Sequence, residues 1–111
     1  MNMATKTQFT KDEYRALLDA VSQAYENELG VALAEVERVF KAWRQGQVLA
    51  SEVSDAIHEF HQHTARDLYS LYNDLPPDTL ACSAVERGYL RAAELPASLR
   101  EKLARHPSWP K

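Results

Sequence analysis

Apolar side chains recur at steps of three and four across the first half of this chain, and this spacing constrains the fold more than any other feature. Such steps place side chains on one face of an α-helix, and the series is Tyr14, Leu18, Val21, Tyr25, Leu29, Ala32, Val36, Val39 and Trp43. Thr10 and Glu13 have the spacing of a capping box, and Gly46 suits a helix end. We predict one helix over about 10–45, continuous or gently kinked at Gly30, because the apolar phase does not slip there.

A second apolar series predicts a partner for this helix. Its members again follow in threes and fours, and they are Val53, Ile57, Phe60, Thr64, Leu68 and Leu71. Ser51 can cap this helix and Pro76-Pro77 ends it, so we predict a helix over about 51–73. The short connection between the two helices favours a long antiparallel hairpin.

The last third of the chain predicts two short helices, over about 79–87 and 96–105. Gly88 suits the end of the first, and Pro96 suits the start of the second. No segment alternates apolar and polar residues as a half-buried strand does. The predicted fold class is therefore all-α.

The length of 111 residues suits a single domain. We expect a flexible N-terminal lead-in over 1–9, one helical domain over 10–106 and a non-helical tail over 107–111. Trp109 in that tail is expected to pack on the domain or on a partner, because a tryptophan gains much from burial.

The composition limits the expected cellular compartment and the kinds of catalytic site that the chain can hold. No stretch approaches the roughly 20 apolar residues of a membrane span, and the first residues lack the apolar region of a secretory signal. Because no apolar stretch is long enough to span a membrane, we expect no membrane partner. Cys82 is the sole cysteine, so we expect no internal disulfide and a cytoplasmic location. Cys82 has no histidine nearby in sequence, and no glycine-rich phosphate loop is present. We expect neither an enzyme nor a cofactor.

The first predicted helix outruns the second by several turns, so part of its apolar stripe needs a cover. Two short C-terminal helices can cover some of the overhang. Self-association covers the rest if two hairpins combine into a four-helix bundle, and a homodimer is expected. The residues proposed for self-association are Leu18, Val21, Val36, Val39 and Phe40.

Charge is unevenly distributed along the chain. Residues 52–78 hold six acidic side chains and one basic side chain, whereas residues 87–111 hold six basic and two acidic ones. The basic end can fold back on the acidic helix, or it can dock an acidic partner. A DNA-binding regulator is the alternative function, with Arg100, Lys102 and Arg105 as possible phosphate contacts. The link between the two short helices is too long for the usual helix-turn-helix.

Histidines cluster in the second predicted helix. Asp55, His58 and His61 are the candidate metal ligands. Carboxylate-bridged metal bundles need two pairs of a carboxylate and a histidine three residues apart, plus two further carboxylates from other helices, and this sequence offers one such pair. We therefore expect no metal. The alternatives are that the two histidines flank the core, or that they titrate near neutral pH and bias an interface.

The flank that carries these histidines continues as a second stripe, formed by residues 58, 61, 65, 69 and 72, with Arg66 beside it. Tyrosine, histidine and arginine favour protein interfaces, although Tyr69 and Tyr72 could also cover the C-terminal helices. We expect a small protein-interaction module: a regulator, adaptor, inhibitor or antitoxin-like protein that binds a protein partner through helix faces. The expected partner contacts are Trp43, Arg66, Tyr69, Tyr72 and Trp109.

Overall fold

The computed structural model describes residues 8–111, and within that range every regular element is a helix. The all-α prediction is confirmed. In chain order the elements are α2 (Lys11–Arg44), α3 (Ala50–Glu59), the π-helical turn η1 (Phe60–Thr64), α4 (Ala65–Asp74), α5 (Pro77–Arg87), the 3-10 turn η2 (Ala92–Glu94) and α6 (Ala97–Leu103). None of these helices is both long enough and apolar enough to cross a membrane.

Local signals define both ends of α2. The Glu13 amide donates to Thr10 Oγ1 at 3.1 Å, and the Thr10 amide donates to Glu13 Oε1 at 2.9 Å, which completes the predicted capping box. The helix continues without interruption through Gly30. It ends at Arg44 with Gln45 as its C-cap, and Gly46 follows with a φ of 76°, a left-handed conformation that suits glycine.

The second helical stretch departs from the predicted pattern at two places. The helix begins at Ala50, and the Leu49 amide donates to Glu52 Oε2 at 2.9 Å, so Glu52 and not Ser51 satisfies its start. In η1 the Ala65 amide donates to the Phe60 carbonyl, which is five residues earlier. Such a π turn takes up an extra residue, so side chains after it are rotated relative to a regular α-helix.

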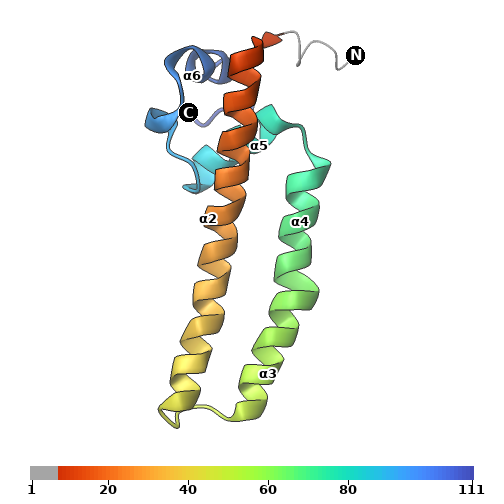
Figure 1. Ribbon diagram of the computed structural model, residues 1–111, viewed down its shortest axis with the longest axis vertical. Coiled ribbons are helices and arrows are strands. Elements are labelled where there is room, and N and C mark those ends of the chain that lie inside the picture. The colour runs from red at the N-terminus through yellow and green to blue at the C-terminus, as the bar shows by residue number, and fades with distance from the viewer. Residues whose placement is uncertain (1–7) are drawn as a thin grey trace.

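Both predicted short helices are present, but α5 begins at Pro77, about two residues before its predicted start, and α6 ends at Leu103, about two residues before its predicted end. Gly88 closes α5 with a φ of 86°, and Pro96 directly precedes α6. Figure 1 shows both helices packed against the N-terminal half of α2, while α3 and α4 return alongside α2 from the far end. The molecule is elongated, with extents of 55 × 28 × 24 Å.

Burial divides the molecule into two regions. The packed end (residues 8–30 and 65–111) contains the core, whose buried residues are Phe9, Leu17, Ala24, Ala81, Cys82, Ala84, Leu90, Leu95, Leu99 and Leu103. The arm (residues 31–64) is a pair of helices in which Val53 is the sole buried residue. A helix pair without a third layer exposes part of both apolar stripes.

The packed region extends beyond the limits expected from sequence. Phe9 is buried, and Lys102 Nζ donates to the Gln8 carbonyl at 2.8 Å, so the packed chain begins before Thr10. The rest of the expected lead-in, residues 1–7, lies outside the described residues. At the other end the tail is non-helical, and Trp109 packs against the core.

Ion pairs fix the basic C-terminal segment mainly to α2. Arg87 bonds Glu28 and Lys102 bonds Glu13, each at 2.6 Å, and both acids lie on α2. From the acidic segment 52–78, Asp78 makes the one such contact found within residues 8–111, with His106 Nε2 at 3.3 Å.

Candidate functional site

The arm carries most of the large apolar side chains that face solvent. Five of the eight such residues lie on it, and they are Val31, Leu33, Trp43, Leu49 and Ile57. Leu49 is 69% exposed and Val31 is 59% exposed. Trp43 and Ile57 line a common hollow, and exposed apolar groups that adjoin one another mark an interaction site more often than scattered ones do.

One hollow lies near the loop end of the arm, and we call it the tip hollow. It has a volume of about 230 Å³ and is lined by Phe40, Trp43, Ala50, Val53, Ser54 and Ile57. The rings of Phe40 and Trp43 meet edge to face with centroids 6.5 Å apart, and the Arg44 guanidinium lies 6.0 Å from the Trp43 ring. Within residues 8–111 no charged side chain lines this hollow, so an apolar group can enter it without desolvating a charge.

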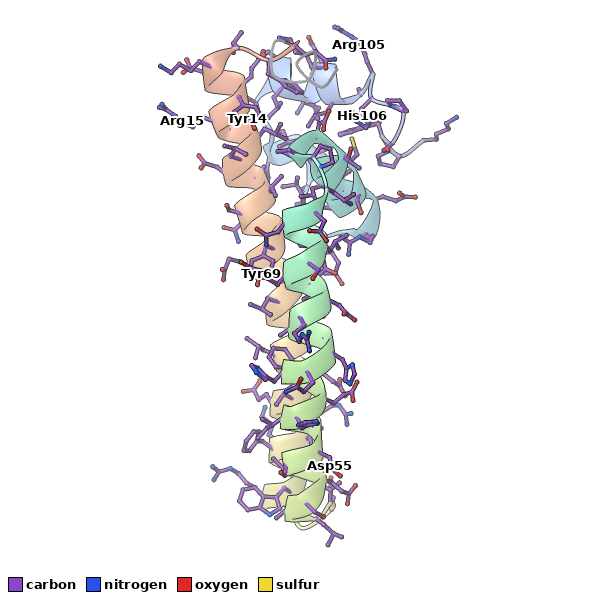
Figure 2. All side chains as sticks on the ribbon, turned by 90° about the vertical axis from the view of Figure 1, so that its right-hand side faces the viewer. Tyr14, Arg15, Asp55, Tyr69, Arg105 and His106 are labelled. Atoms are coloured by element: carbon purple, nitrogen blue, oxygen red, sulfur yellow. The ribbon has the colours of Figure 1, made fainter. Side chains whose placement is uncertain are left out.

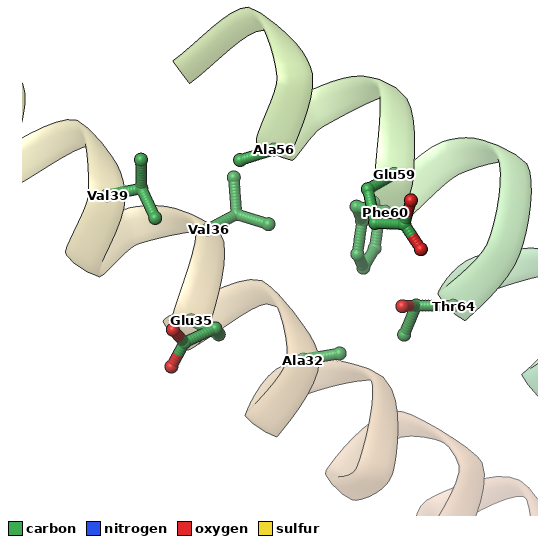
Figure 3. A pocket seen from close by; sticks show the side chains of 8 residues that line it. All are labelled: Ala32, Glu35, Val36, Val39, Ala56, Glu59, Phe60 and Thr64. Atoms are coloured by element: carbon green, nitrogen blue, oxygen red, sulfur yellow. The ribbon is translucent and has the colours of Figure 1, made fainter. Parts of the chain in front are cut away.

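A second hollow, of about 330 Å³, runs between α2 and the stretch formed by α3 and η1. Figure 3 shows side chains from both helices around it, and its lining is Ala32, Glu35, Val36, Val39, Ala56, Glu59, Phe60 and Thr64. It shares Val39, Ala56 and Glu59 with an adjoining hollow of about 530 Å³ that adds Arg38, Ala42, Val48, Glu52 and Asp55.

We call the two hollows together the acidic groove. Among residues 8–111, four acidic side chains line it and Arg38 is the one lysine or arginine; the acids are Glu35, Glu52, Asp55 and Glu59. Arg38 bonds Glu35, and that hydrogen bond lowers the pKa of Glu35.

A third surface lies where α4 meets α2, and we call it the tyrosine face. Two hollows of about 290 and 330 Å³ share Tyr25 and Tyr69 there, and the second is also lined by His61, Ala65 and Arg66. Of the predicted stripe, His61, Ala65 and Tyr69 line this hollow together with Arg66, whereas His58 and Tyr72 do not line it. Tyr69 is 63% exposed and lies midway along the molecule in Figure 2.

Tyr72 lies at the edge of the tyrosine face but is bound within the fold. Its hydroxyl donates to Glu28 Oε1 at 2.8 Å, and its ring meets Tyr25 edge to face at 5.2 Å. Burial and then Glu28 raise the pKa of Tyr72 to about 12. Tyr72 therefore joins α4 to α2, whereas Tyr69 remains available to a partner.

The residues expected to bind a partner or a second copy do not form one continuous surface. Trp43 lines the tip hollow, Arg66 and Tyr69 lie on the tyrosine face, and Trp109 packs against the core. Of the residues proposed for self-association, Val36 and Val39 line the acidic groove and Phe40 lines the tip hollow, while Leu18 and Val21 belong to the packed end.

Ile57 belongs to the apolar series of the second predicted helix, yet its side chain is 46% exposed. Sequence reasoning also missed the acidic groove. The signal was present, because residues 52, 55 and 59 place three acids at steps of three and four on one helix face. Glu35 comes from the other helix, so the groove becomes visible only once the two helices are placed side by side.

The candidate metal ligands do not form a metal site within residues 8–111. Asp55, His58 and His61 are all exposed; Asp55 lines the acidic groove and His61 lines the tyrosine face. In the part of the chain that the structure describes, no three histidine, cysteine, aspartate or glutamate side chains come together in a way that could hold a metal ion.

Two of the three candidate phosphate contacts bind the chain itself. Lys102 bonds Glu13 at 2.6 Å, and Arg100 donates to the carbonyls of Ala92 and Leu95 at 3.4 and 3.5 Å. Arg105 is exposed and lies with His106 at the packed end in Figure 2. The charge of Lys102 is therefore already paired with a carboxylate of the same chain.

Cys82 is buried in the core, and burial followed by the nearby Asp78 carboxylate raises the pKa of its thiol to about 11. A protonated thiol is a weak nucleophile, which fits a packing role for this cysteine.

Comparisons of the chain with protein-family models, with curated proteins and with solved structures find no match. What the chain does is therefore inferred from its own surfaces.

Proposed function

We propose that this chain is a small non-enzymatic protein-interaction module: a regulator, adaptor, inhibitor or antitoxin-like protein that binds a protein partner through the helix faces of its arm. The observation that carries this proposal is the uneven burial of the molecule. The packed end has its own core, whereas the arm exposes five large apolar side chains and buries only Val53. Such a helix pair is stabilised when another protein covers it.

Self-association is the simplest way to cover the arm, and we propose a homodimer in which two antiparallel hairpins form a four-helix bundle. The tip hollow is the contact that best supports this proposal, since it is apolar and has no charged lining. In a twofold dimer the same patch of each copy faces its equivalent. The acidic groove is a poor dimer contact for that reason, because four acids would face four acids.

The tyrosine face is the proposed contact for a different protein. Tyr69 offers a large exposed ring, and Arg66 and His61 add polar groups next to it. Tyrosine and arginine supply much of the affinity in protein interfaces.

Sedimentation equilibrium of the full chain tests self-association without knowledge of any other partner. We expect a dimer at about 10 μM, which corresponds to a dissociation constant in the micromolar range or below. Ile57→Lys places a charge at the tip hollow and should give a monomer with unchanged helix content. Ser51→Lys is the matched control, because Ser51 is an exposed polar residue of the same helix that does not line the hollow. A monomer for the unaltered chain, or equal dissociation by both variants, would contradict the proposal.

A further inference from the structure

The face of α2 that binds the C-terminal helices does not end with the packed end. Leu17, Ala24 and Glu28 lie on this face and contact the layer formed by α5 and α6. Glu35, Val39 and Ala42 continue it at helical spacing into the arm. There it becomes part of the lining of the acidic groove, with no third helix over it within residues 8–111.

The packed end shows how this face is covered. Helix α5 lies against it with apolar side chains, and Arg87 from the end of α5 bonds Glu28 at 2.6 Å. An apolar contact flanked by an arginine–glutamate pair is therefore the arrangement that the chain itself uses here. Further along α2 the same face carries Glu35, but no helix in the described part of the chain supplies the apolar contact.

The charges that line the groove favour a partner of opposite charge. Glu35, Glu52, Asp55 and Glu59 line it against Arg38, which bonds Glu35. Asp55 has no ion pair among the residues that the structure describes, and the nearest basic side chain to Glu59 is that of His63, with its Nε2 at 3.9 Å. A partner with lysine or arginine complements these acids, and a partner with acidic groups is repelled.

We propose that the acidic groove binds an amphipathic helix of a partner protein, with an apolar stripe on the lining and lysine or arginine beside the acids. This inference rests on the proposed function of the arm as an interaction element. Residues 32–42 of α2 span about 15 Å, which a helix of about 10–12 residues covers. The small side chains Ala32, Ala42 and Ala56 permit close approach of a third helix.

A designed peptide tests this proposal directly. The peptide has about 15 residues, with leucines at steps of three and four and lysines at the other positions, so that it folds on binding and is only marginally helical alone. Fluorescence anisotropy with the full chain should show binding that weakens as salt is added. A scrambled peptide of identical composition and a version with glutamate in place of lysine should bind at least about tenfold more weakly.

Variants of the groove locate the binding site. Ala56→Arg fills the hollow and should weaken binding of the lysine peptide by more than about tenfold, whereas Ser51→Arg on the outer side of the same helix should not. Asp55→Asn with Glu59→Gln should weaken it about three- to tenfold and reduce its salt dependence. Urea unfolding shows whether each variant retains the stability of the unaltered chain.

Equal binding of the scrambled peptide, or full binding by Ala56→Arg, would overturn the proposal. Sedimentation separates this inference from the proposed dimer. An intact dimer that fails to bind the lysine peptide overturns only the groove, and a monomer that binds the peptide overturns only the self-association.

Discussion

The packed end and the arm share the helix α2 but differ in what lies against it. In the packed end, α5 and α6 form a third layer that buries Leu17 and Ala24 completely. In the arm the same face of α2 carries Glu35 and Val39 and lies open. The comparison shows that a regular helix can form from local signals along its whole length, while its burial depends on which other segments reach it.

Ion pairs separate the two regions in the same way. Those of the packed end join distant segments: Glu13 to Lys102, Glu28 to Arg87 and Asp78 to His106. In the arm, Glu35 pairs with Arg38 within α2, and Glu59 at the end of α3 lies near His63 of the adjoining η1. Pairs within one helix add little to stability and do not fix one helix against another. The arm is therefore held together mainly by the apolar contacts between its two helices.

The largest expected difference between the regions is the cost of deleting a leucine. Leu17→Ala removes a fully buried side chain and should lower the free energy of unfolding by about 2–5 kcal/mol. Leu33→Ala in the arm, where the side chain is 47% exposed, should cost less than about 1 kcal/mol. Urea unfolding measures both values, and similar costs would remove the distinction between the two regions.

A smaller effect should appear in the pH dependence of stability. Hydrogen bonds from Lys102 and then from the Thr10 amide lower the pKa of Glu13 from 4.5 to about 2. The ionised Glu13 therefore stabilises the fold above about pH 4.5, and this contribution is lost as the pH falls toward 2. The urea midpoints of the unaltered chain and Glu13→Gln should differ at pH 7 and converge as the pH falls through that window. A constant difference across the window would show that Glu13 is not bound in this way.

The two neighbouring tyrosines should respond differently to loss of their hydroxyl groups. Tyr72→Phe removes the hydrogen bond to Glu28 and should cost about 0.5–1.5 kcal/mol of stability. Tyr69→Phe should change stability by less than about 0.5 kcal/mol, because Tyr69 is largely exposed. Thermal or urea unfolding of the two variants side by side measures the difference. An equal loss of unfolding free energy would show that the Tyr69 hydroxyl stabilises the fold and is not free for a partner.

The smallest predicted effect is a gain. Gly30 lies inside α2, is exposed, and has no atom within 4 Å of the position that a Cβ would take. Gly30→Ala should therefore stabilise the chain by about 0.5–1 kcal/mol, since alanine favours a helix interior over glycine. A loss of stability on urea unfolding would indicate that α2 bends at this position.

Helix limits were predictable because they depend on neighbouring residues. The capping box of Thr10 and Glu13 begins α2, Gly88 closes α5, and α4 ends at Asp74, just before Pro76. Pro77 is also the first residue of α5, so that helix begins about two residues earlier than predicted. The π turn over Phe60–Thr64 carried no such signal.

The candidate site was predictable only where one helix supplies it. His61, Arg66 and Tyr69 share a stretch of chain, and their spacing placed them on a common surface. The role of Tyr72 depends on Glu28, 44 residues away, and the acidic groove depends on α2 and α3 lying side by side. Which half of α2 is covered depends on contacts such as that of the Asn27 side chain with the Tyr89 carbonyl, 62 residues apart.

Hydrogen exchange of the full chain, measured below and above the concentration at which it self-associates, tests most directly whether the arm is the interaction element. The arm is predicted to exchange more slowly when the dimer forms, above all near the tip hollow over residues 40–57, while α5 and α6 remain unchanged. Slower exchange confined to α5 and α6, or a dimer that leaves the arm unprotected, would contradict the assignment of the arm as the interaction element.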